Sequence, residues 1–237
     1  MEALRVFITG ASSGIGAATT ELLVERGHRV WGFARSAGEL EGLAERFPER
    51  VVVSRGDVRD AAAVAAAVQA AVDRWGGLDG VVPNAGLGMF NPLESAPLEE
   101  WTRMVEVNIT GVLNVLHAVV PHLLASQGTV VNIGSVAARN VFANSGVYCA
   151  TKHAVLALSE ALRIEFSGRI AVTTVNPGAV DTPFIETTAN EALRESYRPQ
   201  FAGALAPRTI AEAIALALES KGKAVYSEIT VRPDRRG

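Results

Sequence analysis

Cysteine and histidine are scarce in this sequence, whose 237 residues include one cysteine, Cys149, and four histidines. A single cysteine cannot form an internal disulfide, which favours a reducing compartment. His117, His122 and His153 are not spaced as metal ligands beside a cysteine or a group of carboxylates. We therefore predict neither a disulfide scaffold nor a catalytic metal.

Charge of one sign is not concentrated anywhere along the chain. The sequence has 22 basic and 25 acidic residues, which give a formal net charge of −3. These charges are dispersed, whereas a general nucleic-acid-binding protein carries clustered basic residues. We expect no nucleic-acid partner.

Long hydrophobic runs are also missing. A membrane-spanning helix needs roughly 18 consecutive apolar residues. The most apolar segment, Val112–Ala125, is interrupted by four residues: Asn114, His117, Pro121 and His122. The chain also begins with an acidic residue at position 2, where a signal peptide has basic ones. We therefore expect a soluble, cytoplasmic protein with no membrane partner.

What the sequence does contain is a regular alternation of short β-branched runs and longer helical patterns. The predicted strands are Arg5–Thr9, Arg29–Ala34, Val51–Ser54, Gly80–Val82, Thr129–Ile133, Ile170–Val175 and Val225–Val231. The predicted helices are Gly14–Arg26, Glu39–Phe47, Ala61–Trp75, Leu98–Ala125, Val147–Phe166 and Thr209–Glu219. Most strands are continuous apolar runs, as in parallel strands buried on both faces. The alternation predicts one α/β domain over residues 1–237, with a doubly wound parallel sheet.

Residues 179–207 fit this alternation least well. They mix proline, threonine, asparagine and charged residues with the scattered aromatic residues Phe184, Tyr197 and Phe201. A loop-rich insertion beyond a strand end usually forms a lid or a substrate wall in such folds. We expect this insertion to encode much of the substrate specificity.

A glycine-rich turn, Thr9-Gly-Ala-Ser-Ser-Gly-Ile-Gly16, joins the first predicted strand to a helix. Glycines let the backbone approach an anion, and the free N–H groups of a helix start favour negative charge. A tight turn without a ligand is the alternative, but the first strand–helix junction is where dinucleotides bind. We predict cofactor contacts from Gly10, Ser12, Ser13, Gly14, Ile15 and Gly16.

The end of the second strand indicates which dinucleotide binds. An acidic residue there holds the ribose 2′-hydroxyl of NAD, whereas an arginine accommodates the 2′-phosphate of NADP. Ala34 occupies the place of the acid, and Arg35 follows it. An ordinary solvated arginine is the alternative, but the missing acid favours NADP(H) over NAD.

A tyrosine, a lysine and a serine form the candidate catalytic group. Tyr148 and Lys152 are four residues apart in a predicted helix and therefore lie on one face. An ammonium near a phenol stabilises the phenolate, which would lower the tyrosine pKa from about 10 toward neutrality. Tyr148 would then act as a general acid or base. Ser135 follows a strand end, where its hydroxyl can hydrogen-bond the same substrate oxygen. Each signal alone is weak, but together they favour catalysis.

Asn108 lies on a predicted buried helix face made of Trp101, Val105, Asn108, Val112, Val115 and Val119. A buried amide left unpaired costs roughly 1–3 kcal/mol, so Asn108 must be hydrogen-bonded. We expect it to satisfy backbone groups at a helix bend and also to order water beside Lys152.

These motifs closely resemble the short-chain dehydrogenases/reductases over essentially the whole chain. The resemblance implies a Rossmann-type fold of three α/β/α layers with a seven-stranded parallel sheet. It also implies a catalytic tetrad of Asn108, Ser135, Tyr148 and Lys152. Tyr148 would be the acid/base, Lys152 would also bind the nicotinamide ribose, and Asn108 would support a water-linked proton relay.

The same resemblance implies further cofactor contacts. Asp57 and Val58 would contact the adenine, and Val180 and Thr182 the nicotinamide carboxamide. Asn84 and Gly86 would contact the ribose side of the cofactor, and the remaining implied contacts are the motif residues Ala85, Pro177 and Gly178. Arg35 matches the basic position of NADP-preferring members. The chain departs from the family at Pro83, where a second asparagine is common, and at Gly134, where a serine is frequent.

The leading interpretation is an NADP(H)-dependent oxidoreductase that acts on a small-molecule carbonyl or secondary alcohol. An NAD-dependent alcohol dehydrogenase and a non-catalytic dinucleotide sensor are the alternatives. The predicted substrate contacts are Ser135, Ala137, Val141, Tyr148 and Phe184, with Leu87, Met89, Phe142 and Ile185 as further apolar candidates. A stripe of small residues on the Tyr148 helix, together with the resemblance, predicts a homodimer or homotetramer; its members are Ala150, Ala154, Ala157 and Ala161.

Overall fold

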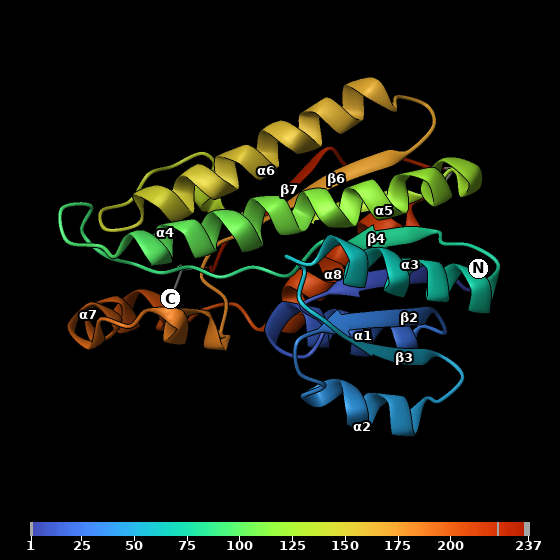
Figure 1. The fold of residues 1–237 in the computed structure, drawn as a ribbon, viewed down its shortest axis with the longest axis horizontal. Coiled ribbons are helices and arrows are strands. Elements are labelled where there is room, and N and C mark those ends of the chain that lie inside the picture. The colour runs from blue at the N-terminus through green and yellow to red at the C-terminus, as the bar shows by residue number, and fades with distance from the viewer. Residues whose placement is uncertain (1, 222, 235–237) are drawn as a thin grey trace.

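Seven parallel strands form one sheet in the computed structural model, which describes residues 2–221 and 223–234 (Figure 1). The strand order is β3-β2-β1-β4-β5-β6-β7. The strands are β1 (Arg5–Thr9), β2 (Arg29–Ala34), β3 (Val51–Arg55), β4 (Gly80–Val82), β5 (Thr129–Ile133), β6 (Ala171–Pro177) and β7 (Glu228–Val231). This confirms the predicted doubly wound sheet. The last strand begins three residues later than predicted, at Glu228.

Helices cover both faces of the sheet and give three layers (Figure 1). The α-helices are α1 (Gly14–Glu25), α2 (Glu39–Arg46), α3 (Ala61–Trp75), α4 (Leu98–Val105), α5 (Gly111–Ser126), α6 (Gly146–Glu165), α7 (Glu191–Phe201) and α8 (Pro207–Glu219). Helices α1, α2 and α8 pack on one face, and α3, α5 and α6 on the other. Within β1, Val6 and Ile8 face the first layer and Phe7 faces the second, as the alternation of strand side chains requires.

The strand order reverses beside β1. The chain runs outward from β1 through β2 to β3 and then crosses to β4, on the other side of β1. The connections after β1 and β4 therefore leave the sheet in opposite directions and open a crevice at the carboxyl ends of these strands, where ligands bind in such folds.

The long helix predicted over Leu98–Ala125 contains a π-helical turn, Glu106–Thr110, between α4 and α5. A π turn adds a residue to one turn and rotates the helix that precedes it relative to the helix that follows. The predicted buried stripe is therefore correct for Val112, Val115 and Val119 but wrong for Val105, which is exposed, while Met104 is buried instead.

The continuous helical segment Leu98–Ser126 is long and apolar enough, by length and composition alone, to cross a membrane. A helix that packs in the core of a protein outside a membrane passes the same test. The α5 residues Val115, Val119 and Leu123 are buried against the sheet. We interpret this segment as a layer helix of the fold.

The insertion at residues 179–207 is more ordered than predicted. It contains a short 3-10 helix, Pro183–Thr187, and the three-turn helix α7. Asn190 caps α7 by accepting a hydrogen bond from the Leu193 backbone N–H at 3.1 Å. The sequence did not indicate this helix because Pro199 lies inside it and its apolar positions are few.

Candidate active site

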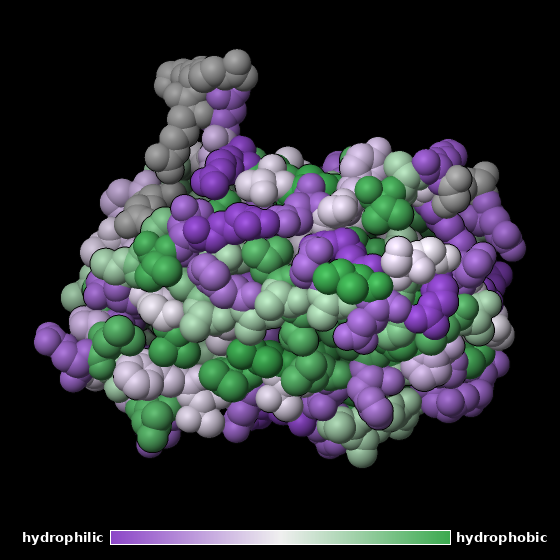
Figure 2. All heavy atoms as spheres, turned by 90° about the horizontal axis from the view of Figure 1, so that it is seen from above, coloured by the Kyte–Doolittle hydropathy of each residue, from purple (hydrophilic) through white to green (hydrophobic). Residues whose placement is uncertain are grey.

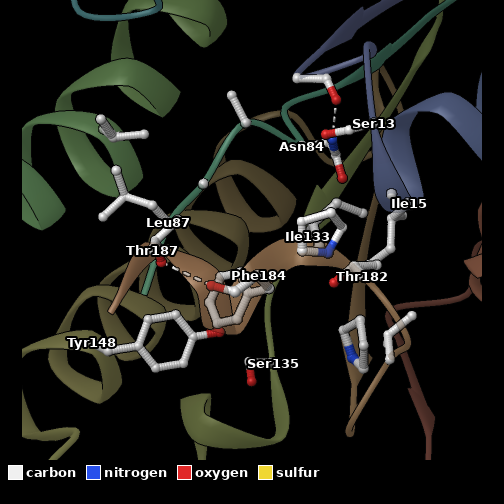
Figure 3. Close-up of a pocket in the computed structure, with 18 of the residues that line it drawn as sticks. Ser13, Ile15, Asn84, Leu87, Ile133, Ser135, Tyr148, Thr182, Phe184 and Thr187 are labelled. Atoms are coloured by element: carbon white, nitrogen blue, oxygen red, sulfur yellow. Dashed lines mark hydrogen bonds between the residues drawn. The ribbon is translucent and has the colours of Figure 1, made fainter. Parts of the chain in front are cut away.

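A cavity of about 1110 Å³ opens at the carboxyl ends of the strands. Its walls come from the segments that follow the strands, and it includes the place beside β1 where the strand order reverses. In Figure 3, Ser13 and Ile15 of the glycine loop lie on one side of the cavity, and Tyr148 lies on the other. Its volume is slightly above the roughly 300–1,000 Å³ that is typical of pockets for a single small ligand.

The glycine loop is held against β4 by a network around Asn84. The Asn84 side-chain amide donates to the carbonyl oxygens of Thr9 at 2.9 Å and Gly10 at 3.1 Å. The Thr9 hydroxyl accepts hydrogen bonds from the backbone N–H groups of Asn84 and Ala85, both at 3.1 Å. Asn84 therefore supports the loop directly, which is a structural role that the sequence did not predict.

The loop needs glycine for two different reasons. Gly10 and Gly14 have φ angles of 63° and 54°, which residues other than glycine rarely adopt. Gly16 has an ordinary φ, but a Cβ there would collide with the Gly10 carbonyl oxygen and lie 2.6 Å from the Asn84 amide. Gly16 therefore lies beneath the loop rather than on the cavity wall.

The amino terminus of α1 is open toward the cavity. The Ser13 side chain makes no capping hydrogen bond, and the first turn contains no acidic residue. Ser12, Ser13, Gly14 and Ile15 line the cavity. Unsatisfied N–H groups and the helix dipole at this end favour an anion, so the residues present fit the pyrophosphate of a dinucleotide.

Three charged residues line the cavity beyond the ends of β2 and β3. The guanidinium of Arg59 binds the Asp57 carboxylate at 2.8 Å and the Glu106 carboxylate at 3.2 Å. The hydrogen bond from Arg59 is the main cause that holds the pKa of Asp57 below its usual value. The positive charge of Arg35 also lowers this pKa. Arg35 itself is exposed at the end of β2, close to Asp57.

Tyr148 and Ser135 face each other at the other end of the cavity (Figure 3). Burial raises the pKa of Tyr148 to about 12, although a hydrogen bond with the Ser135 side chain acts in the opposite direction. The expectation that Lys152 lowers this pKa toward neutrality is therefore wrong in this structure. Removing the phenol from water outweighs every interaction that favours the phenolate.

Lys152 is buried beside the end of β5. Its ammonium donates a hydrogen bond to the Ile133 carbonyl oxygen at 2.9 Å. Burial lowers the pKa of Lys152 to about 8, because a charged group loses hydration there. The two residues share one face of α6, as predicted, but the ammonium is bound to the backbone rather than to the phenol.

Asn108 lies in the π-helical turn and is fully buried. Its side-chain oxygen accepts from the Leu87 N–H at 2.9 Å, and its amide donates to the Leu87 carbonyl oxygen at 2.8 Å and the Thr151 hydroxyl at 3.1 Å. This confirms the predicted structural amide at a helix bend. Asn108 does not itself line the cavity, although Gly86 lies between it and Lys152.

Aromatic rings form the wall around Tyr148. Phe184 lies 5.4 Å from the Tyr148 ring, and Phe90 lies 5.8 Å from Tyr148 and 5.1 Å from Tyr197. The Tyr197 hydroxyl donates to the Ala143 carbonyl oxygen at 2.7 Å, which attaches α7 to the segment before α6. This end of the cavity is thus apolar and aromatic, with the phenol of Tyr148 inside it.

Comparisons with known proteins agree with this geometry. The sequence profile described as short chain dehydrogenase matches residues 5–192. An uncharacterized oxidoreductase of Staphylococcus saprophyticus is 35% identical over 233 residues, which span 96% of this chain and 95% of that protein. The alcohol dehydrogenase of the archaeon Thermococcus sibiricus, solved with 5-hydroxy-NADP, is 32% identical with a TM-score of 0.87 over 98% of both chains.

The chain belongs to the short-chain dehydrogenase family. It is therefore an oxidoreductase of that type, and the family uses NAD(P). The closed form of a serine dehydrogenase complexed with NADP+ is 27% identical with a TM-score of 0.89, and the match covers 95% of this chain and 93% of that one.

The cavity of this short-chain dehydrogenase brings together most of the residues predicted from sequence. The predicted residues that line it are Gly10, Ser12, Ser13, Gly14, Ile15, Arg35, Asp57, Val58, Asn84, Ala85, Gly86, Ser135, Ala137, Tyr148, Lys152, Pro177, Gly178, Val180, Thr182 and Phe184. Val141 does not line it and is 72% exposed, because the segment before α6 turns this side chain outward. Ile185 is buried beside the cavity rather than on its wall.

Sequence reasoning missed some lining residues of this short-chain dehydrogenase. Phe90, Arg59 and Thr187 line the cavity. Phe90 follows the Asn84–Gly86 motif by four residues, and this closeness was the available signal. In the described part of the chain, no three histidine, cysteine, aspartate or glutamate residues are grouped as metal ligands.

Proposed function

We propose that this short-chain dehydrogenase is an NADP(H)-dependent oxidoreductase that transfers a hydride between nicotinamide and a carbonyl or secondary alcohol carbon. One observation carries the proposal. The Tyr148 hydroxyl lies beside Ser135 in the same cavity that contains the open amino terminus of α1. An anion site and a proton donor in one cavity are the two requirements of this chemistry.

In the reduction, Ser135 and Tyr148 bind the substrate carbonyl oxygen. The bound nicotinamide supplies the hydride. Tyr148 gives its proton to the oxygen as the C=O bond becomes a C–OH group, and it takes that proton back when an alcohol is oxidised. Because its pKa is about 12, Tyr148 carries its proton at neutral pH, which is the state that carbonyl reduction requires.

Lys152 and Asn108 support this proton transfer. A protonated Lys152 would hold the nicotinamide ribose and would offset part of the cost of a buried Tyr148 phenolate, without bringing the Tyr148 pKa to neutrality. Asn108 fixes Leu87 and Thr151 and, in our proposal, orders a water that links Lys152 to solvent. A Cβ on Gly86 would lie 3.3 Å from the Asn108 side-chain oxygen and 3.7 Å from the Lys152 nitrogen, so both groups border this glycine.

Arg35 supports a preference for NADP over NAD. It is exposed and lines the cavity at the end of β2, and the Asp57 carboxylate, which feels its charge, is already bound by Arg59. A guanidinium at this place can bind a 2′-phosphate, and β2 ends in Ala34 rather than in an acid that would bind a ribose hydroxyl.

The experiment that tests the proposal is a panel of carbonyl compounds assayed by the absorbance of NADPH and of NADH. Wild-type protein is expected to oxidise NADPH in a substrate-dependent manner, with a higher kcat/KM than for NADH. Arg35→Ala should raise the KM for NADPH about tenfold to a hundredfold, because hydrogen bonds to charged groups contribute roughly 1.5–3 kcal/mol. Arg55→Ala, which removes an exposed arginine at the end of β3, is the matched control.

Failure of every carbonyl compound and alcohol to react would refute the reductase and favour a dinucleotide sensor. An unchanged NADPH preference in Arg35→Ala would refute the role of Arg35. A wild-type preference for NADH would instead support an NAD-dependent alcohol dehydrogenase.

The aromatic wall supports a substrate with an apolar substituent beside its carbonyl group. Phe90 and Phe184 pack against the Tyr148 ring, and Tyr197 packs against Phe90. A Cβ on Gly88 would lie 2.5 Å from the Phe184 ring and 3.3 Å from the Tyr148 ring, so these rings pack closely on the backbone. Carbonyl compounds with aromatic or branched aliphatic groups therefore belong at the centre of the panel.

We also propose that the protein works as a homodimer or homotetramer in the cytoplasm. Ala150, Ala157 and Ala161 of α6 are exposed rather than packed on the sheet. On the same side of the molecule, α4 and α5 expose Leu98 and Leu113. Figure 2, viewed from above, shows hydrophobic residues gathered across this face. A second copy of the chain would cover this surface.

The proposed cytoplasmic location is supported by the lone cysteine, Cys149, which is buried and free, as in a reducing compartment.

Light scattering coupled to size exclusion is expected to give the mass of two or four chains. Ala157→Arg places a long charged side chain on the exposed stripe and should shift the mass toward that of one chain. Ala66→Arg, on an exposed position of α3, should leave the mass unchanged. A wild-type mass of one chain would contradict the proposed assembly.

A further inference from the structure

The backbone of Ser135 is held by a side chain rather than by a neighbouring strand. At the end of β5, the Gly134 N–H still donates to the Val175 carbonyl oxygen at 2.8 Å. The next N–H, that of Ser135, donates instead to the side-chain oxygen of Asn176 on β6, at 3.3 Å. The direction in which Ser135 leaves the sheet therefore depends on Asn176.

Asn176 has a fixed place because it is buried and bound at both ends of its amide. Its side chain is only 2% exposed. Its nitrogen donates to a Glu228 carboxylate oxygen on β7 at 3.2 Å. A Cβ on Gly134 would collide with the Asn176 side-chain oxygen. The missing side chain at position 134 thus provides the space that Asn176 occupies.

Glu228 connects Asn176 to the segment that contains Ser135. Its carboxylate accepts hydrogen bonds from Arg139 at 2.6 and 3.3 Å. Arg139 directly follows the 3-10 helix Val136–Ala138, which begins after Ser135. Asn176 and Glu228 therefore hold this short segment at both ends: at Ser135 through its N–H and at Arg139 through its guanidinium.

We propose that Asn176 and Glu228 form a clamp that positions Ser135 for the reaction. Both are positioning residues, because neither lines the cavity. This inference rests on the proposed function, in which Ser135 binds the substrate oxygen.

The hydrogen-bond pattern of Ser135 explains why its position matters. The Ser135 hydroxyl oxygen accepts from the Ala137 N–H at 3.1 Å. Its own proton is therefore free for the hydrogen bond with Tyr148 and, in the proposed reaction, for the substrate oxygen. A tilt of the segment 135–139 would move this proton away from the oxygen that it must contact. Misplacements of about 1 Å can lower a rate a hundredfold.

Steady-state kinetics and deuterium uptake test the clamp in Asn176→Ala, Glu228→Ala and Glu228→Gln. Asn176→Ala and Glu228→Ala should lower kcat for carbonyl reduction about tenfold or more, with little change in the KM for NADPH. Glu228→Gln keeps an oxygen that accepts from the Asn176 amide, so most of the activity should return. Arg55→Ala removes another surface ion pair, with Glu41, and is the control.

Mass spectrometry of deuterium uptake at the backbone of residues 134–140 measures whether the clamp holds this segment, independently of activity. Uptake should increase in Asn176→Ala and Glu228→Ala and remain near the wild-type level in Glu228→Gln. Unchanged uptake overturns the clamp, and a kcat within about twofold of wild type, corrected for folded protein, overturns the positioning role. If Asn176→Ala fails to fold, the partly exposed Glu228 decides both questions. If wild type reduces no carbonyl compound, the proposed function fails, while the uptake result still decides the clamp.

Discussion

Tyr148→Phe is expected to lower kcat for carbonyl reduction by about a thousandfold, because general acid catalysis contributes roughly 10²–10⁴ in rate. The substitution removes one oxygen atom and leaves the ring between Phe90 and Phe184. Cofactor binding and thermal stability should therefore change little. Burial of the hydroxyl, which raises its pKa to about 12, makes Tyr148 a proton donor at neutral pH. The measurement is NADPH oxidation under saturating substrate, together with the thermal midpoint.

Tyr226→Phe is the matched control, because Tyr226 is exposed and lies outside the cavity. This control should retain wild-type kinetics. A Tyr148→Phe protein with kcat within tenfold of wild type would show that the proton comes from another group or from water, and the proposed mechanism would be wrong.

Gly16→Ala is expected to weaken NADPH binding by about tenfold to a hundredfold. A methyl group at this position collides with the Gly10 carbonyl oxygen and approaches the Asn84 amide at 2.6 Å. The loop must then move away from β4 and lose the hydrogen bonds from Asn84 that hold it. Overpacking of this kind typically costs about 1–3 kcal/mol, so a change in the thermal midpoint should accompany the loss of affinity.

Gly42→Ala supplies the control for this substitution. Gly42 is exposed on α2, and a Cβ there meets nothing within 4 Å. Alanine in a helix is about 1 kcal/mol more favourable than glycine, so this variant should be slightly stabilised and should bind NADPH normally. Calorimetric titration of NADPH measures both variants. Equal affinities in the two variants would show that the loop geometry does not determine cofactor binding.

Much of the fold and of the cavity was predictable because parallel strands end at one edge of the sheet. Gly10, Asn84, Ser135 and Gly178 each follow a predicted strand, and the structure places all four on the cavity wall. Local patterns set the strand ends, and the geometry of a doubly wound sheet brings those ends together.

What the sequence did not reveal depends on contacts between distant residues. The π turn at Glu106–Thr110 exposes Val105, and no local pattern marks that change of helix phase. The pKa of Tyr148 is set mainly by burial, not by the spacing to Lys152. The contact between Asn176 and Ser135 spans 41 positions and depends on the glycine at 134, whose meaning appears only in three dimensions.

The central claim is that the cavity transfers hydride directly between nicotinamide and a carbonyl carbon beside Tyr148. The most direct test uses NADPH with deuterium at one face of C4, with each face labelled in turn, and mass analysis of the alcohol formed by the wild-type protein. The account predicts that one of the two labelled cofactors transfers its deuterium to the carbinol carbon, and that Tyr148→Phe forms almost no labelled alcohol. Alcohol that contains no deuterium from either cofactor would contradict this claim. So would an amount of labelled alcohol from Tyr148→Phe equal to that from the wild-type protein.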